Sequence, residues 1–386
     1  MGQRAKDYDV ATSAPPEHVR TLFGKKRTLS VGASFGVIVV LPTVPGAEPV
    51  EVATFRTEGP YHDGRRPSQV TFATPEEDAR RRDFTINGMF YDPLEQRVLD
   101  FVGGQADIEV RRLRAIGDPL ERMTEDKLRM LRAVRFAATL EFELDPQTRD
   151  AVRQMAGEIQ VVSAERIAQE LRRVLAHPQR ARGFELMSET GLLPVLFPEL
   201  TNETQPAAAV LAVLPKCARF ELAAAAMWHT LPATPHEPRT RQEAAGTVWD
   251  IARRLKLSVH EMQSIAWLVS HQNQWHTAIL QTDAQLKRIL AHPLATDLRH
   301  LVRALAASRG ASQLSSDFID AYLAEHSHEQ IHPPELVSGR DLIESGLRPG
   351  PRFKEILDTL RDAQLNGELR DRETALERLR KMIAPA

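Results

Sequence analysis

The sequence predicts an α+β fold in which a mixed sheet with helices comes first and an all-α remainder follows. Runs rich in β-branched residues at 31–41 and 49–55 predict strands near the N-terminus. From Asp118 onward, apolar residues recur at helical spacing between turn signals, and no strand is expected there. The predicted parts are a head at 1–117, a helical neck at 118–200, and a helical body and tail at 201–386.

The other elements of the head follow from local signals. Residues 7–11 are expected to form a short strand, and a helix is expected over 15–24, where prolines open it and a glycine ends it. The segment 57–74 is rich in glycine, proline and charge, which predicts a long loop. A short helix at 75–82 should lead into a pair of strands within DFTINGMFYD and VLDFVGG.

The composition limits the possible partners. The formal net charge of the 386 residues is -2, so a nucleic acid would have to be held by local basic patches. One such patch, 111–135, has a net charge of +4. The single cysteine, Cys217, excludes a disulfide framework and cysteine-ligated zinc and suits a reducing cytoplasm. No apolar run is long enough to span a membrane, so no membrane partner is expected, and a monomer is slightly favoured.

The segment 125–136, EDKLRMLRAVRF, is the stretch around which the chain is organised. Asp126, Arg129, Arg132 and Arg135 recur every third residue and would form one ridge on a helix. The apolar residues cluster on the other side, which should face a core: Leu128, Met130, Leu131, Val134 and Ala137. An ordinary solvated helix face is the simpler interpretation. However, three stacked arginines repel one another unless an anion lies there, and arginine suits phosphates and base edges.

The first pair of the ridge suits two of the four nucleobases. Cytosine and adenine both present an amino donor beside a ring-nitrogen acceptor on their pairing edge. A carboxylate that accepts, Asp126, and a guanidinium that donates, Arg129, complement both bases. Uracil and guanine present the opposite order, which leaves groups unpaired in a closed pocket. This pair could therefore select C and A without a template.

Two aspartates near the N-terminus are candidate metal ligands. Asp7 and Asp9 are two residues apart on a predicted strand, so both side chains leave the same face. Converging carboxylates repel unless divalent cations lie between them, which is the geometry of magnesium-assisted nucleotidyl transfer. A solvated edge strand is the alternative. Glu51, on another predicted strand, is a candidate third catalytic carboxylate or simply a surface residue.

The segment RRRDFTIN, residues 80–87, combines three arginines with an apolar core and an asparagine. On the functional interpretation, Arg82 contacts a triphosphate, Asp83 orients neighbouring arginines, and Asn87 binds a ribose hydroxyl or phosphate. The alternative is a helix C-terminus at which arginines complement the helix dipole.

Five motifs, KDYDVAT, EVATFR, RRDFTIN, DFVGG and EDKLRMLRAVRF, occur here in the order and approximate spacing of one family. The chain resembles the bacterial (class II) tRNA nucleotidyltransferase and poly(A) polymerase family over nearly its full length. Within that family it looks most like a CCA-adding enzyme, because SVGASFGVIVV and SGRDLIESGLRPGPRFKEIL are similar to segments of that branch.

The resemblance implies a polymerase-β-like nucleotidyltransferase head that adds C and A from CTP and ATP to tRNA 3′ ends and releases pyrophosphate. It implies that Asp7 and Asp9 hold Mg²⁺ and that Asp126 and Arg129 read the incoming base. The nucleotide site would further include Arg82, Asp83, Asn87, Arg132 and Arg135, the last two on the phosphates. The helical remainder would grip the tRNA acceptor arm, and the long loop would serve the switch from C to A.

One departure from the family pattern concerns the N-terminus. The family carries a GG-x-VRD phosphate-cradling motif ahead of the two aspartates, whereas only six residues precede Asp7 here. We expect a reading frame that starts earlier, because so many site residues are kept. The other possibility is a shortened protein with little activity. A poly(A) polymerase and a catalytically impaired RNA-binding homologue are therefore the alternative functions.

Overall fold

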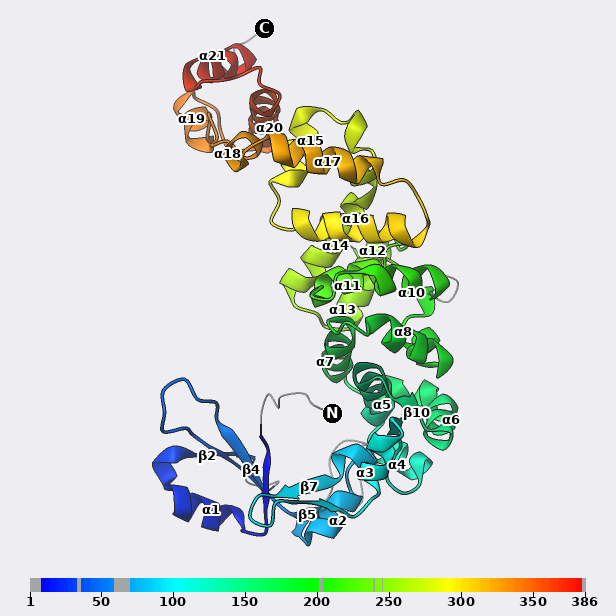
Figure 1. Ribbon diagram of the computed structural model, residues 1–386. Coiled ribbons are helices and arrows are strands. Elements are labelled where there is room, and N and C mark those ends of the chain that lie inside the picture. The colour runs from blue at the N-terminus through cyan, green and yellow to red at the C-terminus, as the bar shows by residue number, and fades with distance from the viewer. Residues whose placement is uncertain are drawn as a thin grey trace. The chain divides into compact units, whose positions relative to one another are not determined.

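The computed structural model describes residues 8–32, 36–58, 70–200, 204–238, 240–244 and 246–383, and it divides into two compact units, 1–204 and 205–386. All strands of the described residues lie in the first unit, while the second unit is helical (Figure 1). The predicted α+β class is confirmed. No helix in the described ranges is both long enough and apolar enough to cross a lipid bilayer.

A four-stranded mixed sheet opens the first unit, in the order β1 (Val10–Thr12), β4 (Val50–Thr54), β3 (Val37–Val40) and β2 (Thr28–Gly32). β1 runs parallel to β4, and the other two pairings are antiparallel. Helix α1 (Pro16–Phe23) packs on one face through Val19, which shares a small core with Ile38, Val40 and Val52. As predicted, prolines precede this helix and Gly24 ends it, with a φ of 84°.

Two strand predictions in this region need correction. The run at 31–41 is not one strand but parts of β2 and β3, which pair antiparallel. Gly36, just before β3, has a φ of 79°, a backbone conformation that glycine adopts without strain. The strand predicted at 7–11 begins only at Val10, so Asp9 precedes it and Asp7 lies outside the described residues.

The rest of the head is built from short pairs. β5 (Arg56–Glu58) pairs with β6 (Val70–Phe72) at the two ends of the predicted loop, and α2 (Pro75–Arg80) follows. A single 3-10 turn, Thr85–Asn87, leads into the predicted strand pair, which is confirmed as β7 (Met89–Asp92) and β8 (Arg97–Asp100). The head closes with α3 (Gly104–Glu109) and β9 (Arg112–Leu113).

The helix predicted over 125–136 is two helices, α4 (Pro119–Glu125) and α5 (Leu128–Leu140). Asp126 lies between them in an extended conformation, with φ -143° and ψ 106°, and its carboxylate accepts the Leu128 N–H at 3.1 Å. A short polar side chain that binds a nearby backbone N–H favours such a break. The ridge therefore begins at Arg129. The predicted core face of α5 is confirmed as buried.

The expectation of no strand after Asp118 is wrong at one place. β10 (Glu143–Leu144) pairs parallel with β9, so the chain returns to the head after α5. The remaining helices of the first unit are α6 (Pro146–Met155), α7 (Ala164–Leu175), α8 (Arg180–Glu189) and α9 (Leu192–Leu196). 3-10 turns occur at Lys25–Arg27, Ala156–Val161 and Pro198–Leu200.

The second unit is a succession of helices, as the sequence predicted. They are α10 (Thr204–Val213), α11 (Phe220–Met227), α12 (Arg241–Ala244), α13 (Val248–Arg254), α14 (Val259–His276), α15 (Asp283–Leu290), α16 (Ala295–Ser308), α17 (Leu314–Glu325), α18 (His328–Ile331), α19 (Gly339–Glu344), α20 (Pro351–Leu365) and α21 (Arg372–Ile383). The last three share an apolar core that includes Leu342, Leu360 and Leu379.

Helices α7 and α8 approach each other closely at a glycine. A Cβ added to Gly183 would lie 2.4 Å from Cγ1 of Val174, a separation that real Cβ atoms do not show. A β-branched side chain in a helix has one strongly preferred rotamer, so Val174 cannot easily turn away. The glycine thus allows the packing of the two helices.

We predict that Gly183→Ala destabilises the protein by about 1–3 kcal/mol through overpacking, even though alanine favours helix formation. Thermal unfolding measures this. Gly157→Ala is the matched control, because a Cβ there meets nothing within 4 Å. Adding Val174→Ala to Gly183→Ala should recover part of the loss. Equal stability of the two glycine variants would contradict the explanation.

Candidate functional site

A buried ion pair joins the RRDFTIN segment to helix α5. Arg132 donates from Nε and Nη2 to Oδ2 of Asp83, at 2.7 and 2.6 Å. The other carboxylate oxygen, Oδ1, accepts from Nδ2 of Asn87 and from the Phe84 N–H, both at 2.9 Å. Burial alone would raise the pKa of Asp83, but the Arg132 charge and these hydrogen bonds together hold it below its ordinary value. Asp83 is therefore ionised at neutral pH.

The ridge arginines each have a carboxylate partner within the protein. Arg129 pairs with Glu125, Arg132 with Asp83, and Arg135 with Glu170, which is buried on α7. The expectation that the arginines need an anion is thus met by the protein's own side chains. A bound phosphate is not required to hold the arginines together, although Arg132 keeps 30% of its side chain exposed.

Asp126 is held by an arginine that was not predicted from the sequence. Arg166, on α7, donates from Nη1 to Oδ1 at 3.1 Å and from Nη2 to Oδ2 at 2.6 Å. This bidentate pair fixes the plane of the carboxylate. Each carboxylate oxygen can accept two hydrogen bonds, so Asp126 retains acceptor capacity for a ligand.

Arg129 is buried and held at three points. Its Nη1 donates to the Arg122 carbonyl at 2.9 Å and to Glu125, and its Nη2 donates to the Arg81 carbonyl at 3.2 Å. Because a guanidinium has five N–H donors, two remain without a partner among the residues that the structure describes. The side chain therefore lies in a fixed position with limited capacity left for a ligand.

Arg82 is anchored by Asp78 and by the backbone of Asn87. Its Nε and Nη2 donate to Oδ2 of Asp78 at 3.2 and 3.1 Å, and its Nη1 donates to the Asn87 carbonyl at 3.0 Å. The guanidinium also lies 4.7 Å above the ring of Phe90. One third of the side chain remains exposed. Arg82, Asp83 and Asn87 are thus brought together, as predicted from their shared motif.

The candidate metal ligands are only partly described. Asp9 and Glu51 are both exposed, and the parallel register that pairs Val10 with Val52 puts them at neighbouring positions when extended by one residue. Carboxylate oxygens are ligands that hard divalent cations prefer. The donor set fits such a cation. Within the described ranges, however, no three acidic, His or Cys side chains form a metal cluster.

The backbone N–H groups of the Gly103-Gly104 turn, at the start of α3, donate to the side chain of Asp100. Oδ1 of Asp100 accepts the N–H groups of Val102, Gly103 and Gly104 at 2.8–3.1 Å, and Oδ2 accepts that of Gln105 at 2.8 Å. Burial opposes the charge, but these four backbone donors hold the pKa of Asp100 below its usual value. The turn therefore has its own anion and is not a phosphate site.

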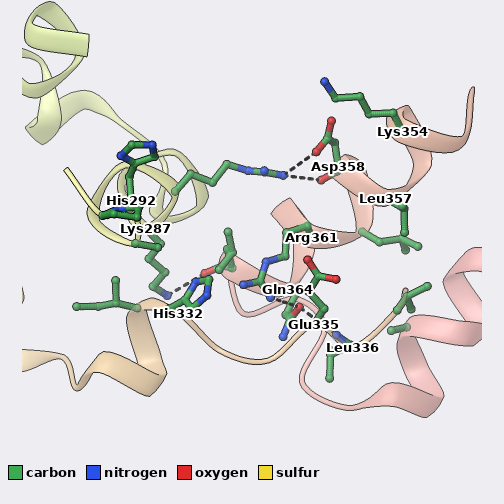
Figure 2. A pocket seen from close by; sticks show the side chains of 18 residues that line it. Lys287, His292, His332, Glu335, Leu336, Lys354, Leu357, Asp358, Arg361 and Gln364 are labelled. Carbon is green, nitrogen blue, oxygen red and sulfur yellow. Dashed lines mark hydrogen bonds and ion pairs between the residues drawn. The ribbon is translucent and has the colours of Figure 1, made fainter. Parts of the chain in front are cut away.

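The second unit contains a hollow of about 490 Å³ between α15, α18 and α20 (Figure 2). Two of its basic side chains pair with carboxylates: Nζ of Lys287 lies 2.9 Å from Asp283, and Nε of Arg288 lies 2.6 Å from Asp362. Arg361 instead donates to the carbonyl of Pro333 and to the side chain of Gln364. The hollow is braced by its own ion pairs, so we do not include it in the nucleotide site.

Three charged residues of the site in the first unit were not predicted from the sequence: Asp78, Arg166 and Glu170. Helical spacing carried a signal for one of them, since Asp78 precedes Arg81 and Arg82 by three and four residues. Arg166 and Glu170 are four apart on α7, but the sequence does not reveal which helix they face.

Comparison with known proteins identifies the two segments of the first unit. The poly A polymerase head domain matches residues 1–114, and the probable RNA and SrmB-binding site of polymerase A matches residues 141–204. The CCA-adding enzyme of Lactococcus lactis subsp. cremoris is 32% identical over 99% of this chain and 90% of its own length. That of Bacillus licheniformis is 33% identical over 98% and 89%.

Solved structures are similar over the whole chain. The Bacillus stearothermophilus CCA-adding enzyme in complex with CTP has a TM-score of 0.77 and 29% identity, covering 99% of this chain and 90% of that chain. The Thermotoga maritima CCA-adding enzyme complexed with tRNA has a TM-score of 0.61 and 18% identity, covering 99% and 88%, and it shows the fold alone. The chain therefore belongs to the family of CCA-adding enzymes and is a nucleotidyltransferase.

Proposed function

We propose that this chain adds C and A nucleotides from CTP and ATP to the 3′ ends of tRNA and releases pyrophosphate. The observation that carries the proposal is the Asp83–Arg132 ion pair, with contacts of 2.6 and 2.7 Å, because it joins the RRDFTIN segment to the helix that follows Asp126. Candidate phosphate and base contacts thus share one site. The family membership and a relative solved with CTP support the same substrates.

The sugar and phosphates would be held by the head segment and by Arg132. Arg82 is anchored through three of its donors and keeps two for a triphosphate. The side-chain amide of Asn87 donates once to Asp83, which leaves its Oδ1 and one N–H for a ribose hydroxyl. Arg132 would bind a phosphate through Nη1, which lies 4.0 Å from Oε1 of Glu170, because Nε and Nη2 bind Asp83. Arg135, which is clamped by Glu170, would act on the phosphates only through its charge.

The base would be read by Asp126 and Arg129. Both are fixed before a nucleotide arrives, Asp126 by Arg166 and Arg129 by backbone carbonyls. Fixed donors and acceptors discriminate well, because a mismatched base leaves a buried polar group unpaired. Cytosine and adenine would satisfy the pair in the same way.

Mg²⁺ would be held by Asp7 and Asp9, and Glu51, at the position next to Asp9 in the strand register, would be a further carboxylate. When bound, the ion stabilises charge on the transferring phosphoryl group. The helical second unit would grip the acceptor arm of tRNA, and this substrate places the enzyme in the cytoplasm.

A product assay tests the proposal. A tRNA that lacks its 3′ end, incubated with CTP and ATP, should gain three nucleotides and then stop, as sized on a gel. CTP alone should give two. A ladder of long A tails would favour a poly(A) polymerase instead, and the absence of any product with intact tRNA binding would favour an impaired RNA-binding homologue.

We expect Asp9→Asn to abolish nucleotide transfer while leaving tRNA affinity unchanged, because RNA affinity depends on separate basic surfaces. Filter binding and single-turnover kinetics measure the two quantities. Glu48→Gln is the control, since this carboxylate is also exposed and lies three residues before Glu51. Near-normal transfer by the Asp9 variant would refute its role at the metal.

Asp126→Ala should let UTP and GTP compete with CTP and ATP. Each lost hydrogen bond should cost about 1–3 kcal/mol, or roughly ten- to a hundredfold in discrimination. Competition assays with mixed nucleotides measure this ratio. Lys127→Ala is the control, because Lys127 is the next residue in the chain but its ammonium pairs with Glu158 at 2.7 Å. If the Asp126 variant is slower but equally selective, the base is read elsewhere.

A further inference from the structure

We infer that Asp78 is a positioning residue that sets both the phosphate side and the base side of the nucleotide site. The inference rests on the proposed roles of Arg82 and Arg129. Asp78 lies on α2, and only 2% of the residue is exposed. It acts through the arginines that surround it.

One oxygen of Asp78 ties α2 to the strand pair of β5 and β6. Oδ1 accepts from Nε and Nη2 of Arg81, at 2.9 and 2.7 Å, and from the Arg56 N–H at 3.2 Å. Nε of Arg81 also donates to the Arg56 carbonyl at 2.9 Å. The carboxylate and Arg81 thus bind both backbone groups of Arg56, the first residue of β5. This arrangement fixes the start of the strand pair that brackets residues 59–69.

The other oxygen orients Arg82. Oδ2 accepts from Nε and Nη2 of Arg82 at 3.2 and 3.1 Å, so Asp78 and the Asn87 carbonyl together determine where the guanidinium points. The carboxylate side chain is 3% exposed, whereas Arg81 and Arg82 are 22% and 33% exposed. The anion therefore lies beneath two cations that face outward.

Asp78 and its two guanidiniums hold one another in place, because removing a partner from a buried pair leaves an uncompensated charge. The partly exposed guanidinium of Arg82 suits a ligand that brings negative charge, such as the triphosphate of the proposed function.

The same cluster reaches the base side through the backbone. The Arg81 carbonyl accepts Nη2 of Arg129 at 3.2 Å, while the Arg81 side chain is fixed on Asp78. The position of Arg81 thus determines one of the three anchors of Arg129. Asp78 lies 51 positions before Arg129 in the chain but is two contacts away from it in the structure.

Asp78→Asn tests the inference. The amide oxygen of the new asparagine can keep the hydrogen bonds from Arg56 and Arg81. The NH₂ group then faces the N–H donors of Arg82, so Arg82 loses its acceptor. We expect the KM for CTP to rise about tenfold, equivalent to ~1.4 kcal/mol. The KM for tRNA and the kcat should change less than twofold. Asp107→Asn is the matched control: Asp107 is equally buried and holds Arg114 at 2.8 Å, outside the proposed nucleotide contacts.

A double-mutant cycle separates positioning from a general loss of stability. Arg82→Ala should raise the KM for CTP by itself, and adding Asp78→Asn to it should then have little further effect. Independent, additive effects would overturn the inference. If Arg82→Ala leaves the KM unchanged, the proposed role of Arg82 fails instead. If only Asp78→Asn leaves it unchanged, the inference alone fails.

Thermal unfolding of each variant accompanies the kinetics. If Asp78→Asn does not fold, Arg81→Met provides the measurement, because it leaves Asp78 paired with Arg82 and removes the side chain that links Asp78 to the backbone anchor of Arg129. The KM for CTP should again rise while the fold is retained. An unchanged KM in that variant would overturn the inference.

Discussion

The buried ion pair between Asp83 and Arg132 is the interaction on which the site depends. A carboxylate at this depth cannot stay ionised without a partner, and a partner removed leaves an uncompensated charge. The two carboxylate oxygens of Asp83 have different partners. Oδ2 accepts from Arg132 on the neck helix, and Oδ1 accepts from the Asn87 side chain and the Phe84 N–H. The head motif and the neck helix are therefore fixed relative to each other by one charged side chain.

From this pair the network extends in two directions. On the neck side, Glu170 binds Arg135, accepts from Arg173 and lies 4.0 Å from Arg132, so α7 is tied to α5. On the head side, Asn87 connects through its carbonyl to Arg82 and so to Asp78. Buried charges in such a chain are each satisfied by a neighbour, which gives a unique arrangement rather than a large gain in stability.

Local patterns made much of the fold predictable from the sequence. The helix at 15–24, the strand pair after RRDFTIN and the core face of α5 all follow from proline, glycine and apolar spacing, and the structure contains them. The break at Asp126 and the strand β10 were not predicted. The break depends on the Asp126 side chain, which accepts a hydrogen bond from a backbone N–H. The strand β10 depends on its pairing with β9, which lies 31 residues earlier in the chain. Neither leaves a periodic signal.

Several residues of the site could be predicted from the sequence, but their ion-pair partners could not. Arg82, Asp83 and Asn87 share a motif, so their proximity follows from the sequence. The stacked arginines do have anionic partners, but the sequence alone does not show that these are Glu125, Asp83 and Glu170, because the contacts join different elements. Arg166 illustrates the same limit: its contact with Asp126 spans 40 residues.

The parallel pairing of β9 with β10 has a consequence for the independence of the head. The Glu143 N–H donates to the Arg111 carbonyl at 2.8 Å and the Asp145 N–H to the Leu113 carbonyl at 2.9 Å, so the segment after α5 completes the last strand of the head. Thr148 adds a side-chain acceptor for the Ala115 N–H at 3.0 Å. A polypeptide ending at residue 117 would lack all three contacts and expose the apolar face of Leu113. We therefore expect the head and the neck to fold together, and fragments cut between them by limited proteolysis to remain associated.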